Sequence, residues 1–287
     1  MLPILVAAHR LDVVFNPGFT APLVCGCAQV TVFHDLQHKR HPEHFRRFDL
    51  PFWNFLLFWS AHLSRILIAV SAATSADLTR YYRVPAEKIR VVPEGVDENC
   101  FAIQRRPEPM LLCVSTLHPH KNLERLLRAF AVFRRSRPEC RLVIAGMRGF
   151  HSAQIERTAK ELALGEAVEF TGWLPRQDLY DLYARAFAFV YPSEFEGFGL
   201  PVLEALAAGI PTVCSRIEPL SSLAAEAALQ FDPTDETALA EALLRVVSDE
   251  PLRAQLARAG PERARLFSWT QSASLTLAAL KEAAGTV

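Results

Sequence analysis

Residues 192–211 read PSEFEGFGLPVLEALAAGIP, and the apolar run FAFVY at 187–191 precedes them. Such a short apolar run is typical of a buried strand. Pro201 suits the first position of a helix, and Gly209 suits its end. The sequence therefore predicts a strand, an acidic loop with a Gly-Phe-Gly turn at 197–199, and a short helix, in that order.

Two carboxylates accompany the start of the predicted helix. Glu196 lies in the loop, and we expect Glu204, eight residues later, in the first turn of the helix. The backbone N–H groups of a helix N-terminus bind anions readily. Carboxylates beside such a site suit a ligand that carries hydroxyls as well as phosphate, as a sugar nucleotide does. The alternative interpretation is that Glu194 and Glu196 are solvated loop charges and that Glu204 only favours the helix dipole.

Length and composition indicate a cytosolic protein of two domains. The 287 residues suggest two domains, and a hydrophobic fraction of 51% is ample for two cores. Lysines with arginines and aspartates with glutamates both total 31, so nothing favours nucleic acid as a partner. Among the six cysteines, Cys25 and Cys27 have no second pair at metal-ligand spacing. We therefore expect reduced thiols and no zinc site. We also expect that no signal peptide precedes the first strand pattern.

The first part of the chain predicts half of a parallel α/β sheet. Helical stretches separate the last three of its four strand patterns. These patterns fall at 12–15, 29–33, 66–70 and 89–92. The second pattern ends at His34 and the third at Ser71. The segment 104–109, QRRPEP, is charged, contains proline and lacks apolar residues, so we interpret it as the linker between domains.

The second part of the chain predicts a doubly wound sheet, because six strand patterns alternate with amphipathic helices. The strand patterns fall at 111–115, 141–145, 168–171, 187–191, 212–214 and 228–231. In the order 3-2-1-4-5-6, the first and fourth strands are neighbours at the switch point, where ligands bind. The basic loop at 116–121 and the acidic loop at 193–199 then meet there. Asn122 is the expected N-cap of the helix at 123–135.

The stretch 50–63, LPFWNFLLFWSAHL, is unusually aromatic. It is too short to span a bilayer, and we interpret it first as a core or inter-domain helix. The second interpretation is a helix on a membrane surface, which would give a cytoplasmic protein peripheral contact with the inner membrane. Arg46, Arg47 and Arg65 flank the stretch and keep this alternative open.

Several segments resemble the retaining glycosyltransferases of family 4, whose signature is a Glu-x7-Glu pattern. They are VTVFHDL at 30–36, IAVSAATSADL at 68–78, IRVVPEGVD at 89–97, STLHPHKNLERLLRAF at 115–130, EFEGFGLPVLEALAAG at 194–209 and FSW at 267–269. The resemblance implies the glycosyltransferase B-type fold, in which two Rossmann-like α/β domains face each other across a cleft. The implied domains are 1–105, joined by a returning helix at 268–287, and 106–267. The first domain is expected to be incomplete, because only one strand pattern precedes the His34 segment.

The chemistry of sugar transfer assigns roles in this pattern, because negative charge develops on the departing pyrophosphate. Lys121 and His120 are placed to stabilise that charge. The resemblance implies that Glu196 contacts hydroxyls of the transferred sugar and that Glu204 contacts the ribose. It also implies that His34 reaches the sugar from across the cleft. The other expected substrate-binding residues are Gly197, Phe198, Gly199, Thr116 and Ser71.

Two positions depart from the family pattern. His120 stands where an arginine commonly precedes the lysine, and neutral imidazole is no cation at high pH. Ser221 and Ser222 stand where a Pro-Glu pair is common, near the nucleotide.

The expected function is transfer of a hexosyl group from a nucleotide-diphosphate sugar, such as GDP-mannose, to a glycan or lipid-linked acceptor. The resemblance implies retention of anomeric configuration, no metal and no cofactor besides the donor. Two alternatives stay open: a non-catalytic sugar-nucleotide-binding module, and an epimerase or hydrolase of the same fold.

Overall fold

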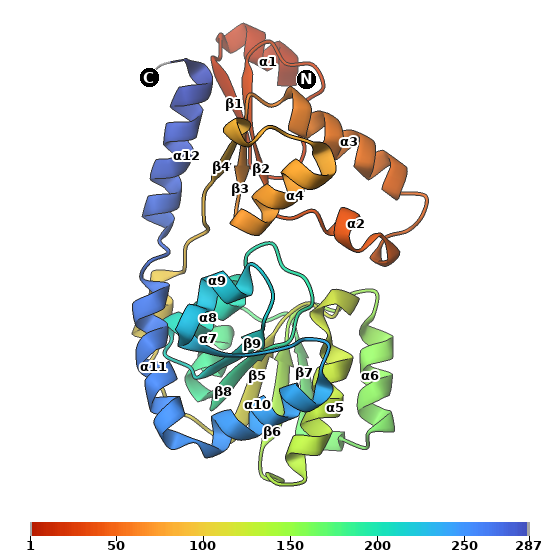
Figure 1. Cartoon of the computed structure of the whole chain (residues 1–287), viewed down its shortest axis with the longest axis vertical. Coiled ribbons are helices and arrows are strands. Elements are labelled where there is room, and N and C mark those ends of the chain that lie inside the picture. The colour runs from red at the N-terminus through yellow and green to blue at the C-terminus, as the bar shows by residue number, and fades with distance from the viewer. Residues whose placement is uncertain (1, 286–287) are drawn as a thin grey trace. The chain divides into compact units, whose positions relative to one another are not determined.

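The computed structural model describes residues 2–285 and shows two compact α/β units (Figure 1). The first unit consists of the residues up to Gly95 together with those from Phe267 onward. The second unit is Val96–Leu266. Both units contain sheets whose strands are all parallel, as the alternation of strand and helix patterns predicted.

The expected linker at 104–109 is part of the second unit instead. Its backbone pairs with the end of helix α7 (Arg176–Arg185), where Arg106 N–H donates to the Ala184 carbonyl at 2.9 Å. The Arg105 guanidinium donates to the Tyr183 and Ala186 carbonyl groups. A charged, proline-containing segment therefore need not be a linker, because main-chain and arginine hydrogen bonds hold it to its unit. The boundary lies earlier, between Gly95 and Val96.

The sheet of the first unit has four strands in the order β1-β2-β3-β4. They are β1 (Val13–Asn16), β2 (Ala28–Phe33), β3 (Ile66–Ala69) and β4 (Ile89–Val91), close to the predicted positions. Its helices are α1 (Leu2–His9), α2 (Gln37–Arg40), η1 (Pro42–His44), α3 (Leu50–Leu63), α4 (Ala72–Tyr82), η2 (Ala86–Lys88) and α12 (Trp269–Ala284). Helix α12 packs on β1, β2 and β3, so the end of the described chain returns to the first unit.

The sheet of the second unit has the predicted order, β10-β9-β8-β5-β6-β7. Its strands are β5 (Met110–Val114), β6 (Arg141–Ala145), β7 (Val168–Gly172), β8 (Ala188–Tyr191), β9 (Thr212–Ser215) and β10 (Ala228–Phe231). Besides α7, its helices are η3 (Glu98–Ala102), η4 (Pro119–Lys121), α5 (Leu123–Arg134), α6 (Ser152–Glu161), η5 (Gly165–Ala167), α8 (Leu200–Ala207), α9 (Leu220–Ala224), η6 (Ala225–Ala227), α10 (Glu236–Ser248) and α11 (Glu250–Ala264).

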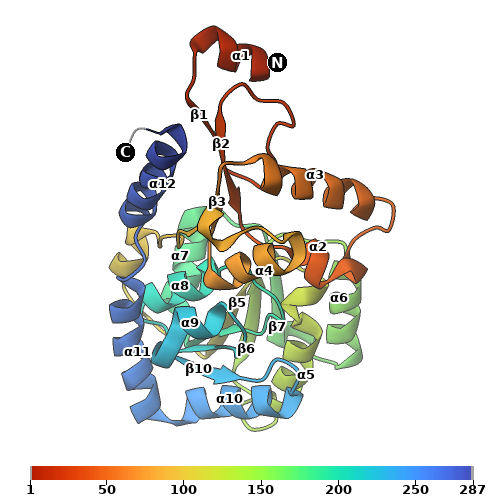
Figure 2. The same cartoon turned by 45° about the horizontal axis from the view of Figure 1, so that its top comes forward.

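Helical periodicity explains the core of the second unit. In α5 the apolar residues recur every three or four positions, and Leu123, Leu126, Leu127, Phe130 and Phe133 are all fully buried. They pack with β5, β6 and β8 in one hydrophobic cluster. Helix α10 packs beside α5, and α11 beside α8 (Figure 2). Among the described residues, no helix is both long and apolar enough to cross a membrane.

Candidate functional site

The candidate site lies at the carboxyl ends of β5 and β8. These strands pair in parallel, with Leu111 opposite Ala188, so the loops that follow them leave the same edge of the sheet. The Glu194 N–H donates to the His120 carbonyl at 2.8 Å and joins the two loops directly. The structure therefore brings the basic and acidic loops together, as their place in the sheet predicted.

Asn122 ties these loops to a third segment. Its side-chain Nδ2 donates to the Pro192 carbonyl at 3.1 Å and to the Pro233 carbonyl at 2.9 Å. Asn122 occupies the N-cap position of α5, as expected, but its side chain makes no capping hydrogen bond. The prediction of a side-chain cap is wrong in that respect, because the Oδ1 atom that would cap the helix accepts from the Arg125 guanidinium at 2.9 Å instead.

Lys121 and Glu196 form a nearly buried ion pair. Lys121 Nζ donates to Glu196 Oε1 at 2.6 Å and to the Tyr191 hydroxyl at 3.1 Å. The two charged side chains are only 13% and 10% exposed. Burial by itself lowers the pKa of Lys121, but Tyr191 and Glu196 outweigh it and raise that pKa above its usual range. The site thus contains a fixed positive charge next to an acceptor-only carboxylate.

Glu204 has two protein partners that the sequence did not indicate. Arg176 donates from a terminal guanidinium nitrogen to Oε1 at 2.7 Å, and the buried Tyr183 hydroxyl donates to Oε2 at 2.8 Å. Both partners come from α7, whose amphipathic pattern carries no signal for a partner 20 to 30 residues further on. Glu204 is the fifth residue of α8, so it lies beyond the first turn where we expected it. The helix starts at Leu200, one residue before the proline, and this moves Glu204 deeper into it.

The turn into α8 requires glycine at position 199. Gly199 has φ of +115°, a backbone conformation that side chains disfavour, and an added Cβ would lie 2.5 Å from Leu220 Cδ2. Phe198 is buried, and Gly197 is half-buried. The close approach of Gly199 to α9 sets the direction in which the acidic loop enters α8.

Thr116 and His120 lie in the loop after β5. The Thr116 carbonyl accepts from the Ser115 hydroxyl at 3.0 Å, and the His118 and His120 rings are stacked with centroids 5.9 Å apart.

Gly146 follows β6, and a Cβ there would lie 2.1 Å from the Ser115 carbonyl oxygen. A partly open pocket of about 190 Å³ adjoins the loop after β5 and is lined by Leu117, Gly146, Arg148, Glu156, Phe170, Thr171 and Gly172.

His34 and Ser71 lie together in the first unit. The His34 ring nitrogens are 3.1 Å from Glu94 Oε1 and 3.0 Å from the Pro17 carbonyl oxygen. The hydrogen bond to Glu94 raises the pKa of His34. Ser71 Oγ accepts from Thr74 N–H at 3.1 Å as the N-cap of α4, and the Thr74 hydroxyl donates to the His34 carbonyl. The observed role of Ser71 is therefore helix capping.

One group of three possible metal ligands occurs in residues 2–285. Donor atoms of His41, Glu43 and His44 lie within 4.8 Å of one another in the first unit. Cys25 and Cys27 have Sγ atoms 3.6 Å apart, but among the described residues no third metal ligand lies with them. The Lys121 and Glu196 loops contain no such group. The expectation of a metal-independent site stays a prediction.

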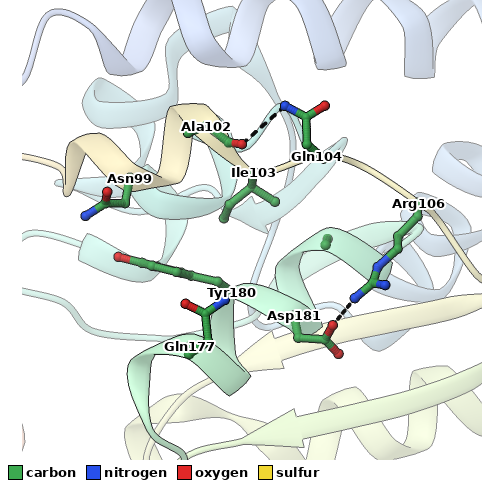
Figure 3. Close-up of a pocket in the computed structure, with 9 residues that line it drawn as sticks. Asn99, Ala102, Ile103, Gln104, Arg106, Gln177, Tyr180 and Asp181 are labelled. Atoms are coloured by element: carbon green, nitrogen blue, oxygen red, sulfur yellow. Dashed lines mark hydrogen bonds and ion pairs between the residues drawn. The ribbon is translucent and has the colours of Figure 1, made fainter.

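The sequence did not indicate an open pocket of about 580 Å³ in the second unit, between η3 and α7 (Figure 3). It is lined by Asn99, Ala102, Ile103, Gln104, Arg106, Gln177, Tyr180, Asp181 and Ala184. Figure 3 shows the ion pair of Arg106 with Asp181 on one side of it. Tyr180 donates a hydrogen bond to Asp97, which also lies 3.8 Å from Arg176. This pocket is thus connected to Glu204 through one charged network.

Comparison with known proteins adds independent information. A family model described as "Glycosyl transferases group 1" matches residues 97–263, more than half of the chain, and one described as "Glycosyltransferase Family 4" matches residues 1–99. O-antigen chain mannosyltransferase B of Escherichia coli is 28% identical over 307 aligned residues, covering 97% of this chain and 80% of that protein. O-antigen chain mannosyltransferase RfbU of Salmonella typhimurium is 27% identical, covering 85% of this chain and 67% of that protein.

A solved structure supports the architecture. Anabaena Alr3699/HepE, in complex with UDP and glucose, superposes with a TM-score of 0.77 at 19% identity, over 99% of this chain and 80% of that one. At that identity the likeness concerns the fold.

Proposed function

The chain belongs to the group 1 glycosyltransferases, and we propose that it moves a hexosyl group, first of all mannosyl from GDP-mannose, to a glycan or lipid-linked acceptor. The nature of the sugar is supported by two mannosyltransferase relatives. A cytoplasmic location agrees with six cysteines that form no disulfide.

The Lys121–Glu196 pair is the observation that carries this proposal. When the bond between the anomeric carbon and the phosphate oxygen breaks, negative charge grows on the departing diphosphate. A lysine whose charge is already fixed at the site stabilises that charge without reorganisation. The Glu196 carboxylate has about four acceptor positions. Lys121 and the Tyr191 hydroxyl use two of them, so the carboxylate still has capacity to accept from sugar hydroxyls.

We propose further that transfer retains the anomeric configuration and needs no metal. This part is supported by the positive charge of Lys121 and the N-terminus of α8, which would neutralise a diphosphate in place of a divalent cation. NMR of the product linkage tests retention. Unchanged turnover in excess EDTA tests the metal, and a loss that Mg²⁺ or Mn²⁺ restores would contradict this part of the proposal.

A donor panel with matched variants tests the function itself. GDP-mannose, UDP-glucose and dTDP-glucose are offered with glycan and lipid-linked acceptors, and products are followed by mass spectrometry. Glu196→Gln should lower transfer on the order of 100-fold, as loss of one oriented transition-state contact does. Glu194→Gln is the matched control, because Glu194 lies in the same loop but pairs with Arg125 at 2.7 Å, and it should change transfer only a few-fold.

The other outcomes identify the alternatives. Tight binding of a nucleotide diphosphate without turnover of any donor would indicate a sugar-nucleotide-binding module. Donor consumption that is independent of acceptor would indicate a hydrolase or epimerase. Equal losses in the Glu194 and Glu196 variants would remove Glu196 from its proposed role.

A further inference from the structure

A group of side chains suited to metal binding follows helix α2 in the first unit (Figure 1). His41, Glu43 and His44 each offer one donor atom, and these atoms lie within 4.8 Å of one another. The proposed sugar transfer gives these residues no role. Two imidazoles with a carboxylate are a donor set that zinc binds in proteins.

The local backbone explains why these side chains gather. Pro42–His44 forms the 3₁₀ turn η1, and the His44 N–H donates to the His41 carbonyl at 3.1 Å. Side chains three positions apart in a 3₁₀ turn project in the same direction. The rings of His41 and His44 are accordingly parallel within 9°, with centroids 5.2 Å apart. The turn therefore presents two imidazoles on one side of the chain.

Glu43 places one carboxylate oxygen near both rings. Its Oε1 is 3.0 Å from His41 Nδ1 and 3.9 Å from His44 Nε2. Zinc binds nitrogen and oxygen ligands at about 2.0–2.1 Å, so the ligands of a tetrahedral site lie about 3.3 Å apart. The two observed separations lie on either side of that value. Binding then requires only that the parallel rings tilt toward a shared ion and that the exposed carboxylate follows.

The segment before the turn is anchored to helix α4. Arg40 Nε donates to both carboxylate oxygens of Asp77 at 3.0 Å. The buried His38 ring has Nε2 2.6 Å from the Tyr82 hydroxyl. A site that begins from such a fixed position loses little conformational freedom when an ion binds.

We propose that His41, Glu43 and His44 bind a zinc ion with water in the fourth position. The inference is independent of the proposed sugar transfer, which involves other residues. Structural zinc sites have four protein ligands, whereas three ligands leave one position open. The Glu43 side chain is 61% exposed, so solvent reaches that position. The bound ion would hold the connection between α2 and α3 in one conformation.

The ligand types decide between the competing interpretations. Magnesium and calcium ions prefer oxygen ligands, so two histidines disfavour them. The alternative without a metal is an ion pair between Glu43 and a protonated His41. Such a pair involves one ring only and gives no reason for the second ring to approach the same oxygen. A shared cation accounts for both rings.

Zinc titration of the full chain, after removal of metal by a chelator and gel filtration, tests the proposal. Calorimetry should show one zinc ion bound per chain, and magnesium should give no binding heat. Cobalt(II), as a spectroscopic substitute, should develop the visible absorption of a tetrahedral site. Zinc should also raise the melting temperature, because it binds the folded state.

Matched variants locate the ion. His41→Gln, Glu43→Gln and His44→Gln should each weaken zinc binding about tenfold or more, because each removes one ligand. His62→Gln, which removes another exposed histidine of the first unit, should bind zinc as the parent chain does.

Two further variants separate this site from other features of the chain. Cys25→Ser with Cys27→Ser removes the two thiols that lie 3.6 Å apart and should leave zinc affinity unchanged. Glu196→Gln should also bind zinc normally, so the sugar-transfer proposal and this one fail separately. Circular dichroism of every variant checks that the fold is intact.

Three results would overturn the proposal. One is a parent chain that binds no zinc, or variants at positions 41, 43 and 44 that bind it as well as the parent. Another is loss of zinc binding in the cysteine variant alone, which would assign the ion to the thiols. The third is tighter binding of iron(II) than of zinc under anaerobic conditions, because two histidines and a carboxylate also form iron sites.

Discussion

Lys121 and Glu196 form a nearly buried ion pair, so their substitution should change the stability of the fold as well as the transfer rate. Removing one partner leaves an uncompensated charge, so Lys121→Met should lower the free energy of unfolding by about 3 kcal/mol. Lys121→Met with Glu196→Gln should recover most of that loss, since no charge is then left unpaired. Transfer should stay abolished in both, because neither variant has the cation for the diphosphate. Urea denaturation and donor turnover measure the two effects.

The Arg125–Glu194 pair supplies the comparison. Its side chains are 25% and 34% exposed, so breaking it should cost about 1 kcal/mol or less. If the double variant of Lys121 and Glu196 regains turnover along with stability, the proposed role of the lysine charge is wrong.

Glu204 combines a structural role with a proposed contact to ribose. A glutamine at 204 offers one acceptor oxygen in place of two, so either Tyr183 or Arg176 would face an NH₂ group. We expect Glu204→Gln to lower the free energy of unfolding, and to weaken GDP binding, by about 1–3 kcal/mol each. Tyr183→Phe removes the same structural hydrogen bond and keeps the carboxylate. By calorimetry it should bind GDP nearly as well as the parent chain, and an equal loss would show that Glu204 acts only through packing.

The buried imidazole of His38 should make the stability of the fold depend on pH. It is 6% exposed, with Nε2 2.6 Å from the Tyr82 hydroxyl, and burial with the charge of Lys39 lowers its pKa to about 4. The unfolded chain therefore binds a proton near pH 6.5 that the folded chain does not bind until about pH 4. As pH falls through this window, stability decreases by up to about 3 kcal/mol.

His38→Gln should flatten that part of the pH profile. Urea denaturation at intervals from pH 7.5 to 4.5 measures it, and His9→Gln, a change at the exposed end of α1, is the control. A parent profile no steeper than that of His38→Gln would contradict a buried neutral imidazole.

At the scale of elements, the turn into α8 depends on one glycine. Gly199→Ala would combine a positive φ with a Cβ only 2.5 Å from Leu220. We expect a loss of about 1–3 kcal/mol in stability and a marked loss of nucleotide affinity, because the acidic loop must shift. Gly165→Ala is the matched control, since Gly165 has φ of +53° but nothing within 4 Å of an added Cβ. It should cost about 1 kcal/mol and leave nucleotide affinity unchanged, as thermal shift with GDP would show.

At the scale of the whole molecule, the first unit is built from two segments far apart in sequence, the residues up to Gly95 and those from Phe267 onward. A Cβ on Gly95 would lie 2.1 Å from the Trp269 nitrogen at the start of α12, and Arg90 pairs with Glu282 near the end of that helix. Gly95→Ala should therefore loosen α12 and reduce hydrogen-exchange protection of β1–β3. Protection of β5 and β8, and GDP affinity, should stay close to the parent values. A parallel loss in β5 and β8 would show that the two units do not respond separately.

The sequence by itself determined the strands and the meeting of the basic and acidic loops. Strand patterns are local. Parallel topology places the carboxyl ends of β5 and β8 side by side independently of which side chains the loops carry. It therefore predicted that the loops carrying Lys121 and Glu196 meet, and the structure adds that the two side chains are in contact at 2.6 Å.

Only the tertiary structure decided features that depend on distant partners. The assignment of 104–109 to the second unit rests on hydrogen bonds to α7, and the burial of Glu204 rests on Arg176 and Tyr183. The exposure of Phe55 and Trp59 on α3 follows from Leu57, Ser60 and Ala61 being the residues that this helix buries. Periodicity shows that a helix has faces, but the neighbour that packs against it selects the face that is buried.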